Sequence, residues 1–109
     1  MKNRDGLLHV TGRSIFTGDI PEPAGTLHAH VFTSSCAHGR ITRLDTQAAL
    51  EMPGVRRVLT WKDIPGENQT GNVIMDEALL AEDEVHYIGQ PVAVVLADTP
   101  ARAGAAAEK

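Results

Sequence analysis

Short apolar stretches alternate along this chain with polar and turn-forming residues, and no periodic segment is long. Residues 26–34 alternate with a period of two, which predicts a strand. One face of this strand carries Leu27, Ala29 and Val31, and the other carries His28, His30 and Phe32. Further strands are expected at residues 40–45, 55–60, 84–89 and 91–98. The last of these is nearly continuous in Val, Ala and Leu, which predicts burial on both of its faces.

Two short helices are expected between these strands. The first covers residues 45–52, with Asp45 or Thr46 as its N-cap and Pro53-Gly54 as its stop. The second begins at Pro100 behind the N-cap Thr99. Residues 61–64 form one helical turn, and residues 21–25 and 65–77 are rich in turn residues. Strands outnumber helices and the two mix along the chain, so the fold class is α+β (mixed α/β), with short strands and two short helices.

The same pattern predicts a core and a mobile segment. The core is expected from residues 27–32, 41–44, 55–59 and 92–96, with residues 48–50 packed over them. Residues 66–84 are polar and are expected to be the most mobile internal part of the chain. Their apolar groups, residues 73–75 and 79–80, are too short to form a core and are expected to rest on a surface outside the domain.

Composition narrows the class of protein. The 109 residues suffice for one domain, and 42% of them are hydrophobic. The net charge is −4, and the scattered basic residues form no stripe, which argues against a nucleic-acid partner. No apolar run reaches membrane-spanning length, and the N-terminus does not resemble a secretory signal. The single Cys36 excludes an internal disulfide and an iron–sulfur cluster held by this chain alone, and a cytoplasmic location is expected.

His28 and His30 are the first candidates for chemistry, because residues two apart on a strand share a face. Two histidines so placed can bind a metal, with Cys36, His38 or Asp45 as a conceivable third ligand. A half-solvated strand face explains the pair equally well.

The other candidates also have simpler explanations. Cys36 would need His38 as its base to act as a nucleophile, and an inert thiol is the simpler interpretation. His86 fits a structural or surface position. The acidic residues Asp76, Glu77, Glu82, Asp83 and Glu84 fit a solvated face better than an acid–base pair. Gly89-Gln90-Pro91 most simply forms a turn, and no phosphate-binding motif occurs. The sequence therefore predicts no catalytic, cofactor-binding or metal-binding residue.

An ordered series of short motifs carries a family resemblance. The motifs follow one another in the order found in xanthine dehydrogenases and aldehyde oxidases. They are HVTGRSIFTGDI, GTLHAH, AHGRI, LDT, PGV, DIPGEN, DE, IGQP and ADTP. The chain resembles the N-terminal α/β hammerhead domain of their molybdenum-binding subunit over residues 8–108. The family often has Tyr, Asp and Val where this chain has Phe16, Gly18 and Ile88. We expect an N-terminal tail at residues 1–7 and a hammerhead domain at residues 8–109, truncated at its C-terminus.

The resemblance implies a function for a larger parent enzyme. Such enzymes hydroxylate purines with oxygen from water and pass electrons through Fe–S clusters and FAD to NAD. Their molybdopterin and their catalytic residues lie in the region that follows the hammerhead, and Fe–S and FAD belong to other domains or subunits. The resemblance thus implies that this segment is structural, with the rest of the molybdenum subunit and the Fe–S and FAD units as partners. The alternatives are the hammerhead of an aldehyde oxidase or another molybdenum hydroxylase, and a stand-alone non-catalytic binding module. A biotin or lipoyl carrier would need a lysine at a hairpin tip, which Lys2, Lys62 and Lys109 do not provide.

Overall fold

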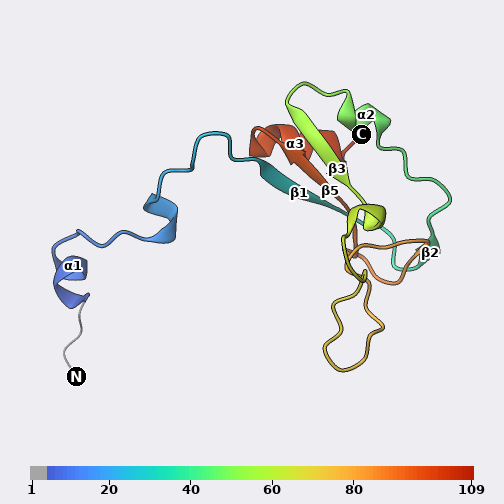
Figure 1. Ribbon diagram of the computed structural model, residues 1–109, viewed down its shortest axis with the longest axis horizontal. Helices are drawn as coiled ribbons and strands as arrows, with labels where there is room; N and C mark the ends of the chain where they lie inside the picture. Colours follow the sequence, from blue (N-terminus) through green and yellow to red (C-terminus); the bar gives the residue numbers. More distant parts are fainter. Residues whose placement is uncertain (1–4) are drawn as a thin grey trace.

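The computed structural model describes residues 5–109, which form two parts (Figure 1). Residues 27–109 make up the body, which contains the sheets, and residues 5–26 form an N-terminal arm that points away from it. The radius of gyration is 18.9 Å, whereas a compact chain of this length would have about 13 Å. The projecting arm accounts for this expansion.

A three-stranded antiparallel sheet forms the centre of the body. Strand β5 (Pro91–Ala97) lies in the middle, between β1 (His28–Thr33) and β3 (Val55–Leu59). Val94 of β5 pairs with Val31 of β1 and Leu59 of β3. The strands expected at 26–34, 55–60 and 91–98 are therefore confirmed, and the apolar run at 91–98 takes the central position.

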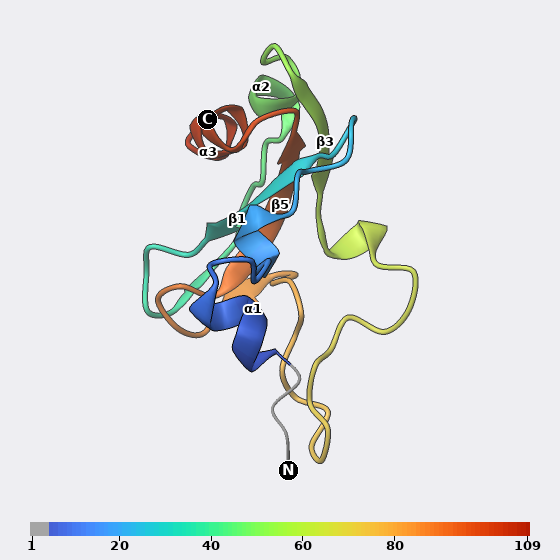
Figure 2. The same cartoon turned by 90° about the vertical axis from the view of Figure 1, so that its left-hand side faces the viewer.

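Helices cover one face of this sheet (Figures 1 and 2). Helix α3 (Pro100–Ala107) begins as expected, because the Thr99 hydroxyl accepts a hydrogen bond of 3.3 Å from the backbone N–H of Arg102. Helix α2 (Gln47–Leu50) is shorter than the expected 45–52, and Asp45 accepts from the Gln47 N–H just before it. The 3₁₀ turn η2 (Trp61–Asp63) confirms the expected helical turn.

The main core is small and is built largely from alanine and valine. Ala49, Val95 and Ala106 are its buried centre, and Met52, Val55, Val58 and Ala107 pack around them. No large side chain among the described residues is fully buried. Because buried apolar area supplies most of a fold's stabilisation, this core makes the body only modestly stable by itself.

A second apolar cluster lies beneath a two-stranded ladder of β2 (Gly39–Arg40) and β4 (Glu84–Val85). It consists of Ala81, Val85 and Val92 with Ile41 beside them. Of the strands expected at 40–45 and 84–89, only the parts that fall within β2 and β4 are confirmed, and the remainder of both predictions is wrong. The Gln90 side chain accepts the His86 N–H at 2.6 Å, and Gly89 has φ 89°, so residues 86–90 turn back instead of extending the ladder.

The expected core is also wrong at its margins. Strand β1 lies at the sheet edge, and its side chains Val31 and Phe32 are 45% and 39% exposed. Leu44 and Leu50 are exposed as well. Strand β5 is not buried on both faces, because Val94 and Leu96 are only partly covered. Val31, Val94 and Leu96 stay open because helices lie over one face of the sheet only, whereas Phe32 lies on the covered face but on an edge strand.

The N-terminal arm contains two short helical elements that the sequence did not indicate. These are α1 (Gly6–Val10) and the 3₁₀ turn η1 (Thr17–Asp19). Of the expected tail, residues 1–4 lie outside the described residues, and Gly6 and Leu7 belong to α1. The turn expected at residues 21–25 is present, with Gly25 at φ 85°.

The long connection between η2 and β4 is pinned within the body. The Asn68 side chain donates to Leu80 O at 2.7 Å and accepts from Leu80 N–H at 2.9 Å. Leu80 and Ala81 are buried, so the expectation that residues 79–80 rest on an outside surface is wrong for Leu80. Val73, Ile74 and Met75 at the tip stay exposed.

We expect Asn68→Ala to loosen this connection without unfolding the sheet. The substitution removes both side-chain hydrogen bonds to Leu80 and leaves a part-buried N–H and C=O without those partners, at a cost of about 1–3 kcal/mol. Amide exchange at residues 77–81 should accelerate, whereas exchange at residues 92–96 should not. Gln69→Ala is the neighbouring control, because the side-chain oxygen of Gln69 has no hydrogen-bond partner. Equal protection of residues 77–81 in both variants would contradict the pinning by Asn68.

Candidate functional site

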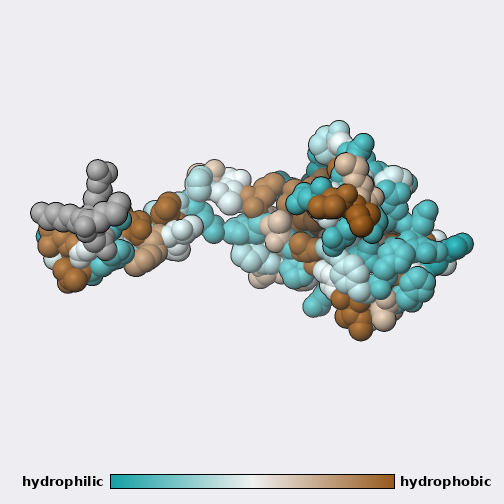
Figure 3. Space-filling view, turned by 90° about the horizontal axis from the view of Figure 1, so that it is seen from below, coloured by the Kyte–Doolittle hydropathy of each residue, from teal (hydrophilic) through white to brown (hydrophobic). Residues whose placement is uncertain are grey.

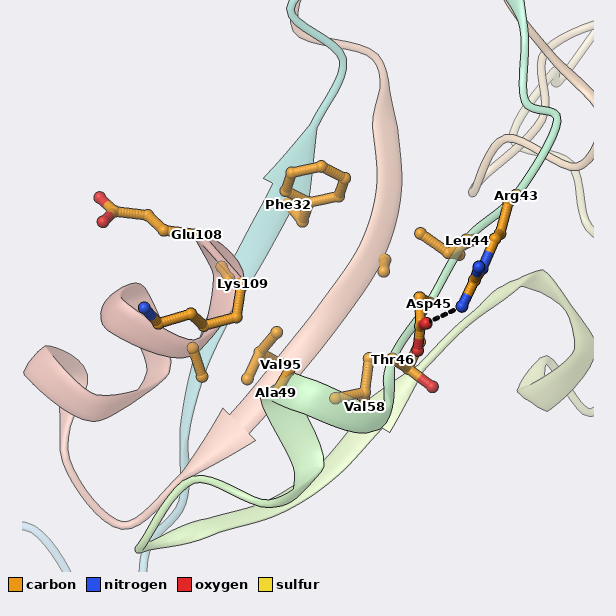
Figure 4. Close-up of a pocket in the computed structure, with 13 residues that line it drawn as sticks. Phe32, Arg43, Leu44, Asp45, Thr46, Ala49, Val58, Val95, Glu108 and Lys109 are labelled. Carbon is orange, nitrogen blue, oxygen red and sulfur yellow. Dashed lines mark hydrogen bonds and ion pairs between the residues drawn. The ribbon is translucent and has the colours of Figure 1, made fainter.

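A groove between α2 and α3 has a largely apolar lining and a volume of about 350 Å³ (Figure 4). Its floor is the helix-covered face of the sheet. The apolar lining residues are Phe32, Leu44, Ala49, Val58, Ala93, Val95, Ala106 and Ala107. Four of them are alanines, so the hollow exists because small side chains leave space above the strands.

The rim of this groove is charged. Arg43 and Asp45 form an ion pair on the side of α2, and Glu108 and Lys109 stand at the end of α3 (Figure 4). The backbone N–H of Gln47 and the Arg43 guanidinium hold the pKa of the Asp45 carboxyl below its ordinary value, so this carboxylate stays ionised at neutral pH. An apolar floor with a charged rim can receive an apolar side chain from another folded region.

His28 and His30 do share one face of β1, as expected, but the structure does not bring their suggested third ligands to them. The register pairs His28 with Ala97 and His30 with Val95, so both histidines lie on the helix-covered face. His28 forms a 3.4 Å ion-pair contact with Glu22. A Cβ added at Gly104 of α3 would lie 3.6 Å from His30 Nδ1, which places that ring against the helix.

Zinc should not raise the melting temperature of the parent chain, and replacing His28 and His30 together with Ala should change its thermal stability little. A metal that binds the native state must raise its apparent stability, and a pair of histidines without a third ligand binds weakly. Thermal unfolding with and without equimolar Zn²⁺ measures this, with the parent chain as the reference. A zinc-dependent rise in the parent that disappears in the double variant would establish a metal site on β1.

Cys36 and His38 do not form a nucleophile and base pair. Cys36 is exposed, and its backbone N–H donates to the Ser34 hydroxyl at 3.1 Å. The His38 ring lies instead beside the His86 ring, with centroids 5.5 Å apart. His86, which the sequence placed on a strand, follows β4 in the turn that Gln90 closes.

The acidic residues line a shallow open hollow with His86 and Tyr87. Glu82 accepts a 3.0 Å hydrogen bond from Asn68, and Glu84 forms a 3.2 Å ion pair with Arg40. The remaining members, Asp76, Glu77 and Asp83, are exposed. A solvated acidic surface explains the whole run.

Most arginines of the body are paired with carboxylates. Arg102 donates to both oxygens of Asp98, at 2.8 and 2.7 Å, and these hydrogen bonds lower the pKa of Asp98 below its ordinary value. The backbone N–H of Thr60 lowers the pKa of Asp63, and Arg57 adds to this effect. These aspartates remain charged at neutral pH. They neutralise arginines whose positive charge a nucleic-acid interface would need.

Sequence reasoning missed the structural importance of two amide side chains, Gln90 and Asn68. Gln90 is only 3% exposed and closes the turn before β5. Asn68 holds the long connection to Leu80. Their only sequence signal was an amide residue beside turn formers, which is too common to single them out. The groove was missed as well, because its walls come from segments far apart in the sequence.

Within residues 5–109, no group of three or more His, Cys, Asp or Glu residues could hold a metal ion. Gln69 Oε1 is the one buried side-chain polar atom without a hydrogen-bond partner in this range. No helix in the described part of the chain is long and apolar enough to cross a membrane.

A sequence family described as the a/b hammerhead domain of aldehyde oxidase and xanthine dehydrogenase matches residues 11–109. This chain belongs to that hammerhead-domain family. Xanthine dehydrogenase of Oryza sativa subsp. japonica is 46% identical to it over 103 residues, which are 94% of this chain and 8% of the relative. Aldehyde oxidase 3 of Rattus norvegicus is 43% identical over 107 residues, which are 98% of this chain and 8% of the relative. The hammerhead chain thus spans less than a tenth of these relatives.

Solved structures agree with the family. The aldehyde oxidoreductase from Desulfovibrio desulfuricans superposes on the hammerhead chain with a TM-score of 0.84 and 33% identity, over 96% of this chain and 13% of that one. A Cu,Mo carbon monoxide dehydrogenase gives a TM-score of 0.83 and 31% identity, over 99% of this chain and 14% of that one. The expected hammerhead fold is confirmed, and the relatives include a molybdenum enzyme.

Proposed function

We propose that this hammerhead domain is a structural module of a xanthine dehydrogenase-like molybdenum hydroxylase. It packs on the region that binds the molybdenum cofactor and helps to seat the Fe–S and FAD units, and it supplies no reacting group. The parent enzyme is a cytoplasmic purine hydroxylase that delivers electrons to NAD. The observation that carries this proposal is the amount of apolar surface that the domain leaves exposed, because its own small core does not bury it.

Several features of the body support a covering partner. The main core is built from small side chains, whereas Val31, Val73, Ile74 and Met75 are 45%, 94%, 68% and 72% exposed. The alanine-lined groove is open as well. Exposed apolar area on this scale marks interaction surfaces in soluble proteins. Because the matched relatives are more than ten times longer than the matched segment, their remaining regions are the natural partner.

Aldehyde oxidase is the second candidate for the parent enzyme. Identity to the rat aldehyde oxidase, 43%, is close to the 46% for the rice xanthine dehydrogenase. The stretch DIPGENQTG with Asp76-Glu77 resembles xanthine dehydrogenases more closely. Since the domain provides no substrate-binding residue in this proposal, its sequence bears on ancestry and not on substrate choice.

A chimera tests the structural function directly. Residues 5–109 replace the matching segment of the rice xanthine dehydrogenase, and a variant with that segment deleted is the control. We expect the chimera to be recovered as folded, molybdenum-loaded enzyme that retains the substrate preference of the rice protein. The deletion variant should fail to fold. A chimera as poorly folded as the deletion variant would overturn the proposal.

A further inference from the structure

The arm, residues 5–26, carries a set of apolar side chains that the rest of the chain does not cover (Figure 3). Their exposed fractions are high: Leu7 72%, Val10 82%, Ile15 77%, Phe16 64% and Ile20 60%. Water contact with so much apolar surface on one short segment is unfavourable unless another surface covers it.

The arm nevertheless has a defined local structure. Helix α1 ends in a Schellman motif, in which Gly12 takes φ 67°. The N–H of Gly12 donates to His9 O at 3.2 Å, and the N–H of Arg13 donates to Leu8 O at 2.8 Å. The Phe16 N–H donates to the Asp19 carboxylate at 2.9 Å, and the Phe16 ring stacks on His9 with centroids 6.0 Å apart. The apolar side chains are therefore displayed from an ordered backbone, which lowers the entropy cost of binding.

Little holds the arm to the body. Among the described residues, every hydrogen bond that residues 6–20 form stays inside the arm. The Glu22–His28 contact joins the two parts only at the root of the arm. Its direction in Figures 1 and 2 is thus not explained by contacts within this chain.

The superposition on a longer chain supplies the second observation. The match to the Desulfovibrio desulfuricans aldehyde oxidoreductase covers 96% of this chain at a TM-score of 0.84. That coverage includes most of the arm, and the matched segment is 13% of the other chain. A projecting arm of this kind therefore occurs inside a much larger polypeptide, where further folded regions are present to receive it.

We propose that the arm is a docking element. Its apolar side chains contact an apolar surface on the larger region of the same molybdenum hydroxylase polypeptide. This proposal rests on the proposed function and names the contact that joins the domain to its partner.

Trypsin cleavage after the exposed Arg13 measures whether the arm is docked. In the 109-residue chain we expect rapid cleavage that leaves the melting temperature of the body unchanged. In the rice chimera we expect cleavage at least about tenfold slower, because proteolysis follows the population of the open form. Val10→Asp with Ile15→Asp should restore rapid cleavage in the chimera, or prevent its assembly, without altering the melting of the 109-residue chain.

The matched control puts the same two charges at polar or small exposed positions of the arm, as Thr17→Asp with Ala24→Asp. This variant should retain slow cleavage in the chimera. The proposal is overturned if the assembled chimera is cut as fast as the free chain, or if both double variants behave alike. It is also overturned if the free chain shows concentration-dependent protection of Arg13, since the partner would then be a second copy. Failure of the unsubstituted chimera to fold would instead count against the proposed function.

Discussion

Val95→Asp should abolish folding of this chain. Val95 is 2% exposed and lies in the main core between Ala49 and Ala106. An unpaired carboxylate there costs several kcal/mol, and a domain of this size has a total stability of about 5–15 kcal/mol. The small alanine-rich core places this domain at the lower end of that range. Circular dichroism in a urea titration should show no cooperative transition.

Val94→Asp is the matched control, one residue away on the same strand. Val94 points to the face of the sheet that no helix covers and is only partly buried. A carboxylate at this position can reach water, so we expect a cooperative transition with a loss of about 1–2 kcal/mol. Equal damage from both substitutions would show that Val94 is as inaccessible to water as Val95, which would contradict the open face of the sheet.

Gly54→Ala should destabilise the body by about 1–3 kcal/mol, the next largest effect. Gly54 has φ 87°, where an L-residue costs about 1–2 kcal/mol. A Cβ added there would lie 2.6 Å from Asp98 Oδ1 and 2.7 Å from Arg102 Cδ, so the Asp98–Arg102 ion pair would have to move. The turn that links α2 to β3 and the start of α3 would both be disturbed, and the midpoint of urea unfolding should fall.

Gly25→Ala tests whether backbone strain in the arm affects the stability of the body. Gly25 has a similar φ of 85°, but no atom lies within 4 Å of a Cβ built on it. It also sits in the arm, so its strain should leave the unfolding midpoint of the body nearly unchanged. If Gly25→Ala lowers the midpoint as much as Gly54→Ala, the arm contributes to the stability of the body and is not independent of it.

The family and most of the secondary structure could be predicted from the sequence. The alternation in residues 26–34, the apolar run at 91–98 and the Thr99-Pro100 helix start are local patterns, and each produced its expected element. The ordered motifs located the hammerhead domain, which the family match then confirmed. The surface location of the acidic run also followed from sequence, because closely spaced carboxylates repel one another unless they are solvated.

Lengths and burial could not be predicted in the same way. The expected strands at 40–45 and 84–89 shrank to two residues each, because the Gln90 side chain takes the His86 N–H and ends the ladder. Val31 and Phe32 were expected in the core but lie on an edge strand. The edge position of β1 depends on which distant segment lies alongside. The Gln90–His86 hydrogen bond is local, but an amide residue beside turn formers is too common a signal to predict it.

Local patterns in the amino-acid sequence thus determined the strands and the start of α3, and the ordered motifs identified the family. Only the tertiary structure decided that helices cover one face of the sheet, that alanines leave a groove between α2 and α3, and that the arm stands apart with its apolar side chains uncovered. The physical reason is that hydrogen-bonding patterns and caps act over a few residues, whereas burial depends on surfaces brought together from the whole chain.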